Sequence, residues 1–234
     1  MSLALPVPDA PVVSVAEAIA RMEAIGASLT ATDGIACFNR MYLDVTRQVN
    51  ASLTQGFFAD AAFMTRLDVT FANLYFAAAD TLSDPSAVPL AWRPLVERRS
   101  AAGIEPIQFA LAGMNAHINH DLPLAVVATC VALGTAPSAG SHYADYQKVD
   151  TLLDAAEQSV RESFESGLEL AMDRHLAAVA DLIGNWTINS ARDLAWNNCL
   201  LLWELRHVPV ARDLFLGSLA ASTAAAGQLL LVAV

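Results

Sequence analysis

Residues 106–133 have the sequence PIQFALAGMNAHINHDLPLAVVATCVAL, a run of apolar and small residues that is long enough for about eight helical turns. A helix that is apolar on all sides is expected at the centre of a bundle, where neighbouring helices cover each of its faces. The only acidic or basic side chains in this stretch are His117, His120 and Asp121. We therefore expect these three polar groups to lie inside the core.

Helical periodicity extends over nearly the whole chain on both sides of this stretch. Ser14, Asp33 and Asp60 stand where the N-caps of the first three helices should be. Strand signals are almost absent, because no segment shows sustained alternation of apolar and polar residues. Besides the central stretch, helices are expected over residues 15–29, 34–53, 61–82, 92–102, 143–183, 191–207 and 214–234.

These elements predict an all-α fold, a single-domain bundle of about eight helices around the central apolar helix. Residues 1–13 are expected to form an N-terminal extension and residues 14–234 the helical domain. The uncharged stretch 214–234 is long enough to cross a membrane, but its glycine, serine, threonine and glutamine residues favour a buried core helix. We therefore do not expect a membrane span.

The composition excludes nucleic acid as a partner. The chain has 24 acidic and 13 basic side chains and a net charge of −11, and Lys148 is its one lysine. A phosphate-binding surface needs clustered lysine and arginine side chains. The three cysteines occur singly in apolar stretches, which indicates reduced, buried thiols and a cytoplasmic protein. A homodimer is left open.

The three polar groups of the central helix are expected to share one direction. At about 100° per residue, Asp121 lies about 40° from His117, and His120 lies about 60° to the other side. Gly113, one turn earlier on the same stripe, should leave room beside them. Pro123 removes a backbone N–H and leaves the carbonyl of Asn119 without its helical donor, so a bend is expected next to the trio. The trio is either a functional site or a buried structural network.

Other helices could complete such a site. His175 lies on an inward-facing stripe, and Glu204 stands three residues before His207, a spacing that can place a carboxylate and an imidazole on one metal ion. Asp68 lies on the apolar face of its helix, where a carboxylate is costly unless it is paired. The candidate metal ligands are His117, His120, Asp121, His175, Glu204 and His207. The candidate substrate-binding residues are Asp68, Tyr75, Trp196 and Trp203.

The segments Gln108–Ala125, Phe71–Tyr75 and Cys37–Tyr42 resemble an uncharacterised bacterial all-helical family annotated only as a domain of unknown function. This resemblance covers most of the chain and implies no activity. A shorter match, His117-x-x-x-Asp121 followed by Pro123-Leu124, is similar to the zinc-dependent phospholipases C and single-strand nucleases. Leu122 and Ala125 replace two histidines of that group, so the similarity implies at most a mononuclear or dinuclear remnant of its zinc site.

Three functions remain open at this point. The first is a metal-dependent hydrolase in which zinc, iron or manganese activates water toward an apolar or ester-like substrate. The second is a metal-free isomerase or cyclase in which Asp121 orients a histidine that acts as acid or base on a hydrophobic small molecule. The third is a non-catalytic helical bundle that binds a ligand. The expected catalytic residues are His117, His120 and Asp121.

Overall fold

The computed structural model describes residues 5–84, 86–153 and 188–233, and this part of the chain is all-helical, with no strand. The expected fold class is therefore confirmed. Residues 142–153 are also helical. The other helices are α1 (Val15–Ser28), α2 (Gly34–Thr54), α3 (Ala61–Ala79), α4 (Arg93–Arg98), α5 (Pro106–Met114), the π-helical segment η1 (Asn115–Asp121), α6 (Leu122–Leu133), α9 (Ile188–Leu205) and α10 (Pro209–Leu230).

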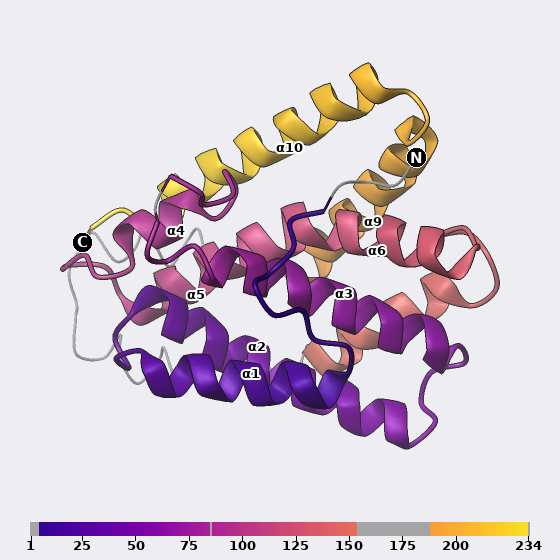
Figure 1. The fold of residues 1–234 in the computed structure, drawn as a ribbon, viewed down its shortest axis with the longest axis horizontal. Helices are drawn as coiled ribbons and strands as arrows, with labels where there is room; N and C mark the ends of the chain where they lie inside the picture. Colours follow the sequence, from indigo (N-terminus) through magenta and orange to yellow (C-terminus); the bar gives the residue numbers. More distant parts are fainter. Residues whose placement is uncertain (1–4, 85, 154–187, 234) are drawn as a thin grey trace.

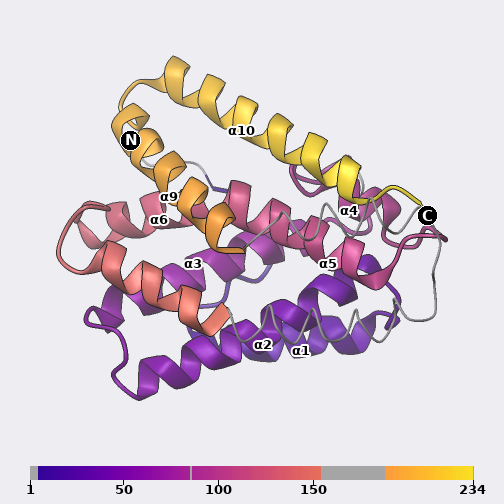
Figure 2. The ribbon, with the colours of Figure 1, turned by 180° about the vertical axis from the view of Figure 1, so that it is seen from behind.

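The central apolar helix is present as the continuous rod α5–η1–α6. In Figures 1 and 2 the rod runs through the middle of the molecule, with α1 and α2 on one side and α10 on the opposite side. Helix α2 packs against α5, both α3 and α9 pack against α6, and α10 packs against η1. By length and composition Pro106–Leu133 could cross a membrane, but 67% of its apolar window is buried among the other helices.

The expected helix starts are confirmed by hydrogen bonds. The side chain of Ser14 accepts the backbone N–H of Glu17, and that of Asp33 accepts the N–H of Ile35. Asp60 caps α3 in the same way through the N–H of Phe63. Each cap satisfies one of the N–H groups that the first helical turn leaves without a partner.

The C-terminal helix α10 differs from the expected fully buried core helix. One face, which includes Leu219 and Leu230, is buried, whereas Leu214 and Leu229 on the other side are each 69% exposed. Buried amides of the central rod hold the inner face, because Gln108 donates to the carbonyls of Leu230 and Val232. Asn115 similarly donates to the carbonyl of Thr223 at 2.8 Å. The rod therefore fixes α10 by polar as well as apolar contacts.

The bend expected at Pro123 takes the form of a π-helical turn on its N-terminal side. The backbone N–H of Leu122 donates to the carbonyl of His117, five residues back, instead of to the carbonyl four residues back. In a regular α-helix the Pro123 ring would clash with the carbonyl of Asn119 and leave it without a donor. The wider turn relieves this conflict, and Pro123 then lies in the first turn of α6, where its missing N–H is tolerated. π-Turns of this kind are frequent at functional sites.

Gly113 does not leave the free space that its position on the stripe suggested. A Cβ atom built at Gly113 would lie 2.4 Å from the ring of Phe38, so α2 fills this space with an aromatic side chain. Close packing of α2 against α5 therefore needs glycine at this position, whereas a Cβ at the exposed Gly217 of α10 would meet nothing within 4 Å.

We expect Gly113→Ala to lower the free energy of unfolding by about 1–3 kcal/mol through overpacking against Phe38. Gly217→Ala is the matched control, and it should raise the free energy of unfolding by about 0.5–1 kcal/mol because alanine is the better helix former. Urea denaturation followed by circular dichroism measures both values. A urea midpoint for Gly113→Ala equal to or above that of the wild-type protein would contradict the close packing of α2 against α5.

Candidate functional site

The Asp121 carboxylate is the polar centre of the core and accepts three N–H groups. Its Oδ2 accepts the Trp92 indole N–H at 2.9 Å and lies 3.1 Å from Nδ1 of His117, and its Oδ1 lies 2.7 Å from Nδ1 of His120. Burial alone would raise the pKa of this carboxyl group, but the hydrogen bonds from the two histidines outweigh burial and lower that pKa. Asp121 is therefore ionised, and each imidazole presents Nδ1–H to it.

His117 is left with a free ring nitrogen that faces the interior. Burial lowers the pKa of His117 below its usual value, although Asp121 opposes this shift. The imidazole is therefore neutral, and with its proton on Nδ1 the other nitrogen, Nε2, carries a lone pair. Nε2 is buried and has no hydrogen-bond partner among the described residues. Phe71 stacks on the ring at 3.5 Å and Tyr42 contacts it edge-on at 4.5 Å between centroids, so its orientation is fixed.

His117 lines a cavity of about 80 Å³ between α2, α3, η1, the helix at residues 142–153 and the start of α9. This volume holds about three water molecules, or a group of similar size. Most lining side chains are apolar, and three of them are methionines, Met41, Met64 and Met114. The described polar or ionisable side chains on the lining are Tyr42, Asp68, His117, Tyr146 and Arg192.

Two further polar groups on this lining lack partners. The Tyr42 hydroxyl and Oδ2 of Asp68 are buried and make no hydrogen bond within the described ranges. Burial raises the pKa of Asp68 to about 7, so near neutral pH a large share of this carboxyl group keeps its proton. Burial, and then the charge of Asp68, raise the pKa of Tyr42 well above its usual value. Both side chains therefore present hydrogen-bond donors to the cavity.

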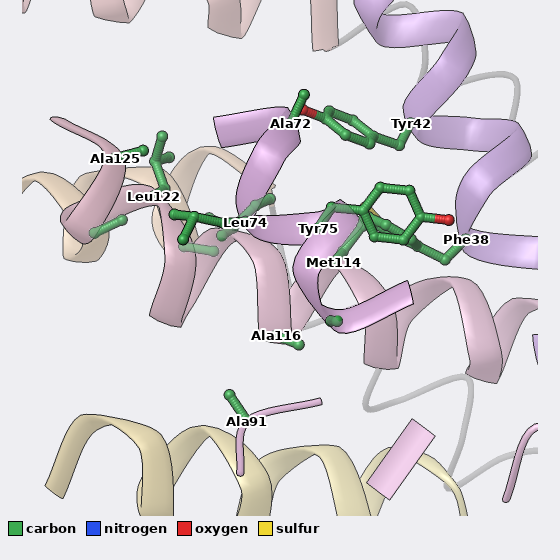
Figure 3. Packing of buried hydrophobic residues seen from close by; sticks show 14 of the residues in the cluster. Phe38, Tyr42, Ala72, Leu74, Tyr75, Ala91, Met114, Ala116, Leu122 and Ala125 are labelled. Carbon is green, nitrogen blue, oxygen red and sulfur yellow. The ribbon is translucent and has the colours of Figure 1, made fainter. Parts of the chain in front are cut away.

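Several expected substrate-binding residues lie elsewhere. In Figure 3 the hydroxyl groups of Tyr42 and Tyr75 point in opposite directions, and the Tyr75 hydroxyl donates to Asn39 at 3.0 Å. Trp196 packs against Tyr146 at 4.7 Å, away from the lining.

Trp203 is also absent from the cavity, because it lies under the guanidinium group of Arg206, 3.7 Å from the ring centroid. Of the four expected substrate-binding residues, Asp68 alone lines the cavity. Sequence reasoning missed the roles of Tyr42, Trp92 and Arg192. Tyr42 lies on the apolar stripe of its helix, so its position in the sequence does not distinguish it from a core residue.

The expected metal-ligand set is not brought together. Glu204 and His207 are exposed near the end of α9, and His175 lies outside the described residues. Within the described ranges, no group of three or more histidine, cysteine, aspartate or glutamate side chains is placed to hold a metal ion. Both oxygens of Asp121 already accept N–H groups, from Trp92, His117 and His120. Among the described residues, the side chains at this site do not form a metal-ligand set.

Comparisons with known proteins identify a family and no activity. The profile of a family of unknown function (DUF5995) matches residues 15–233. No curated protein and no solved structure matches the chain, and the similarity to zinc-dependent phospholipases C and nucleases is not shown. The resemblance to an uncharacterised all-helical family is confirmed. Since the match spans all but the ends of the chain, the protein belongs to this family of unknown function.

Proposed function

We propose that the protein is a metal-free acid–base isomerase that acts on a small, largely apolar molecule. The observation that carries this proposal is the buried, unpartnered Nε2 of His117, because His117 lines a cavity whose wall also contains the unpartnered Tyr42 hydroxyl and Asp68 carboxyl groups. Buried polar atoms without partners are costly in a folded protein. A ligand that uses these three atoms would remove that cost.

His117 is suited to act as the base. A general base must be oriented toward the proton that it removes, and a carboxylate on the second ring nitrogen provides this orientation. Asp121 accepts Nδ1–H and stabilises the imidazolium that forms when Nε2 takes a proton. Trp92 donates to the same carboxylate oxygen and fixes its position. The orientation of His117 is therefore set by Asp121 on one ring nitrogen and by the stacked Phe71 ring.

Asp68 and Tyr42 are suited to act as donors. A carboxyl group that an apolar site keeps protonated at neutral pH can donate a hydrogen bond or a proton to an oxygen that gains negative charge. The pKa of Asp68, about 7, lies well above that of the ionised Asp121. The two aspartates therefore have different tasks, since one is an acid in the cavity and the other is a permanent anion behind the base.

The proposed reaction balances without a further reactant. Nε2 of His117 removes a proton from a carbon next to an electron-withdrawing group, and the negative charge moves onto that group, which accepts hydrogen bonds from Tyr42 and Asp68. The imidazolium then returns the proton to the same carbon or to another one. Return to another carbon gives an isomer. When the imidazolium first exchanges its N–H proton with solvent, return to the same carbon gives hydrogen exchange.

We expect the wild-type protein to accelerate exchange of carbon-bound hydrogen for deuterium in D2O in at least one small neutral probe among acetone, acetonitrile and methyl acetate. His117→Gln should reduce this exchange by about 10²–10⁴-fold, the usual contribution of a general base. Proton NMR of the probe measures the rate. Treatment with EDTA should leave the rate unchanged.

His120→Gln is the matched control for this experiment. Its side chain also contacts Asp121 but does not line the cavity, and glutamine can still donate to the carboxylate. Exchange close to the wild-type rate is therefore expected for this variant. No acceleration of any probe by the wild-type protein would contradict acid–base catalysis, and loss of exchange with EDTA would favour a metal-dependent enzyme.

The raised pKa of the buried Asp68 leads to a prediction about how the stability of the protein depends on pH. Because its pKa rises from 3.8 to about 7 on folding, the protonated carboxyl contributes stability below pH 3.8 that is lost as the pH rises to about 7. Over this pH range the free energy of unfolding falls by about 4 kcal/mol in total, because each unit of pKa shift corresponds to about 1.4 kcal/mol. Asp68→Asn should therefore gain stability relative to wild type over this pH range, as measured by denaturant unfolding. If the free energies of unfolding of the two proteins changed in parallel with pH, this result would contradict the raised pKa of Asp68.

A further inference from the structure

A buried arginine forms part of the cavity wall, and its charge is already balanced. The Arg192 side chain is 6% exposed, and its Nε donates to Oδ1 of Asp150 at 2.5 Å. Its Nη2 donates to the carbonyl of Tyr146 at 2.5 Å, and the guanidinium group lies 4.1 Å from the centroid of the Tyr146 ring. Arginine does not lose its proton in proteins, so the ion pair with Asp150 is what neutralises it.

This ion pair determines which ligand charge the cavity can accept. The other described polar groups on the lining are Tyr42, Asp68, His117 and Tyr146, and none of them is a cation in the neutral state of the site. A carboxylate ligand would lose its hydration and find no unpaired positive charge in the described wall, which is costly in an apolar cavity.

The hydrogen-bonding groups on the wall are mostly donors. Tyr42 and the protonated Asp68 offer O–H groups, and Arg192 uses two of its N–H groups for Asp150 and Tyr146 and has others that make no hydrogen bond to the described residues. The unpartnered acceptor is Nε2 of His117. A ligand that fits this pattern has an oxygen that accepts hydrogen bonds and a carbon-bound proton for the base.

We propose that the cavity selects a small neutral carbonyl compound over the carboxylate of the same size, and that the Arg192–Asp150 ion pair sets this charge preference. This inference rests on the proposed function, because the carbonyl group is what makes the neighbouring C–H acidic enough for the base. The volume of about 80 Å³ limits the enclosed part of the ligand to a few non-hydrogen atoms.

Acetone and acetate test this preference, because they have the same shape and differ in charge. Three methionines line the cavity, so the 13C-labelled methyl groups of Met41, Met64 and Met114 report on binding by NMR. Met22 is fully buried, does not line the cavity and is the internal reference. We expect acetone to shift the three signals with a dissociation constant at least tenfold lower than that of acetate.

Asp150→Asn tests the role of the ion pair. Removing the carboxylate charge leaves the Arg192 guanidinium group unbalanced beside the cavity, so acetate should bind at least tenfold more tightly than to the wild-type protein. Asp80→Asn is the matched control, since Asp80 pairs with Arg21 at 2.6 Å and this arginine stacks on Phe76 away from the cavity. The control should leave the affinity for acetate unchanged.

Each result bears on a different part of the proposal. Equal binding of acetate and acetone to the wild-type protein, or no saturable shift with any probe, would overturn the inference whether or not Asp150→Asn folds. An unchanged acetate affinity in a folded Asp150→Asn protein would overturn the role of the ion pair. Acetone that binds selectively but does not exchange its hydrogens would support the charge preference and contradict the isomerase.

Discussion

The structure depends on one buried anion, the carboxylate of Asp121, in the middle of an apolar helical rod. An unpaired carboxylate in such a place would be very costly, and it is stable here because three N–H groups from Trp92, His117 and His120 surround it. These contacts join the segment before α4 to the central rod and fix both imidazoles. The same interaction thus holds the core together and leaves one imidazole nitrogen of His117 free toward the cavity.

The π-turn is what allows this arrangement beside a proline. Pro123 excludes a regular α-helix through residues 119–123, and the wider turn satisfies the carbonyl of His117 through the N–H of Leu122. In this turn His117, four residues before Asp121, and His120, one residue before it, both reach the Asp121 carboxylate. The Pro123 ring therefore makes the helix locally irregular, and the irregular turn holds the two imidazoles around the Asp121 carboxylate.

The fold could be predicted from the sequence because periodicity and helix caps are local signals. Ser14, Asp33 and Asp60 begin helices through contacts within a few residues. The apolar stretch 106–133 is expected to be central because it has no polar side. The trio of His117, His120 and Asp121 could also be proposed, since polar groups in an apolar helix are conspicuous. The partners of the trio could not be predicted from the sequence. Trp92 and Tyr42 are separated from the trio by long stretches of chain, and they belong to patterns that are typical of any core.

The misplaced residues show the same limit of sequence reasoning. Trp196 and Trp203 fall on one face of a helix, but that face meets Tyr146 and Arg206 rather than the cavity. Arg192 on the same helix reaches the cavity instead, because its ion pair with Asp150 allows a charged side chain to be buried there. Pairing therefore allows charged side chains to lie in the interior of this protein. Asp121 and Arg192 are buried with partners, whereas three buried groups on the cavity wall, His117 Nε2, the Tyr42 hydroxyl and Asp68 Oδ2, have no hydrogen-bond partner among the described residues, and our proposal assigns them to a ligand.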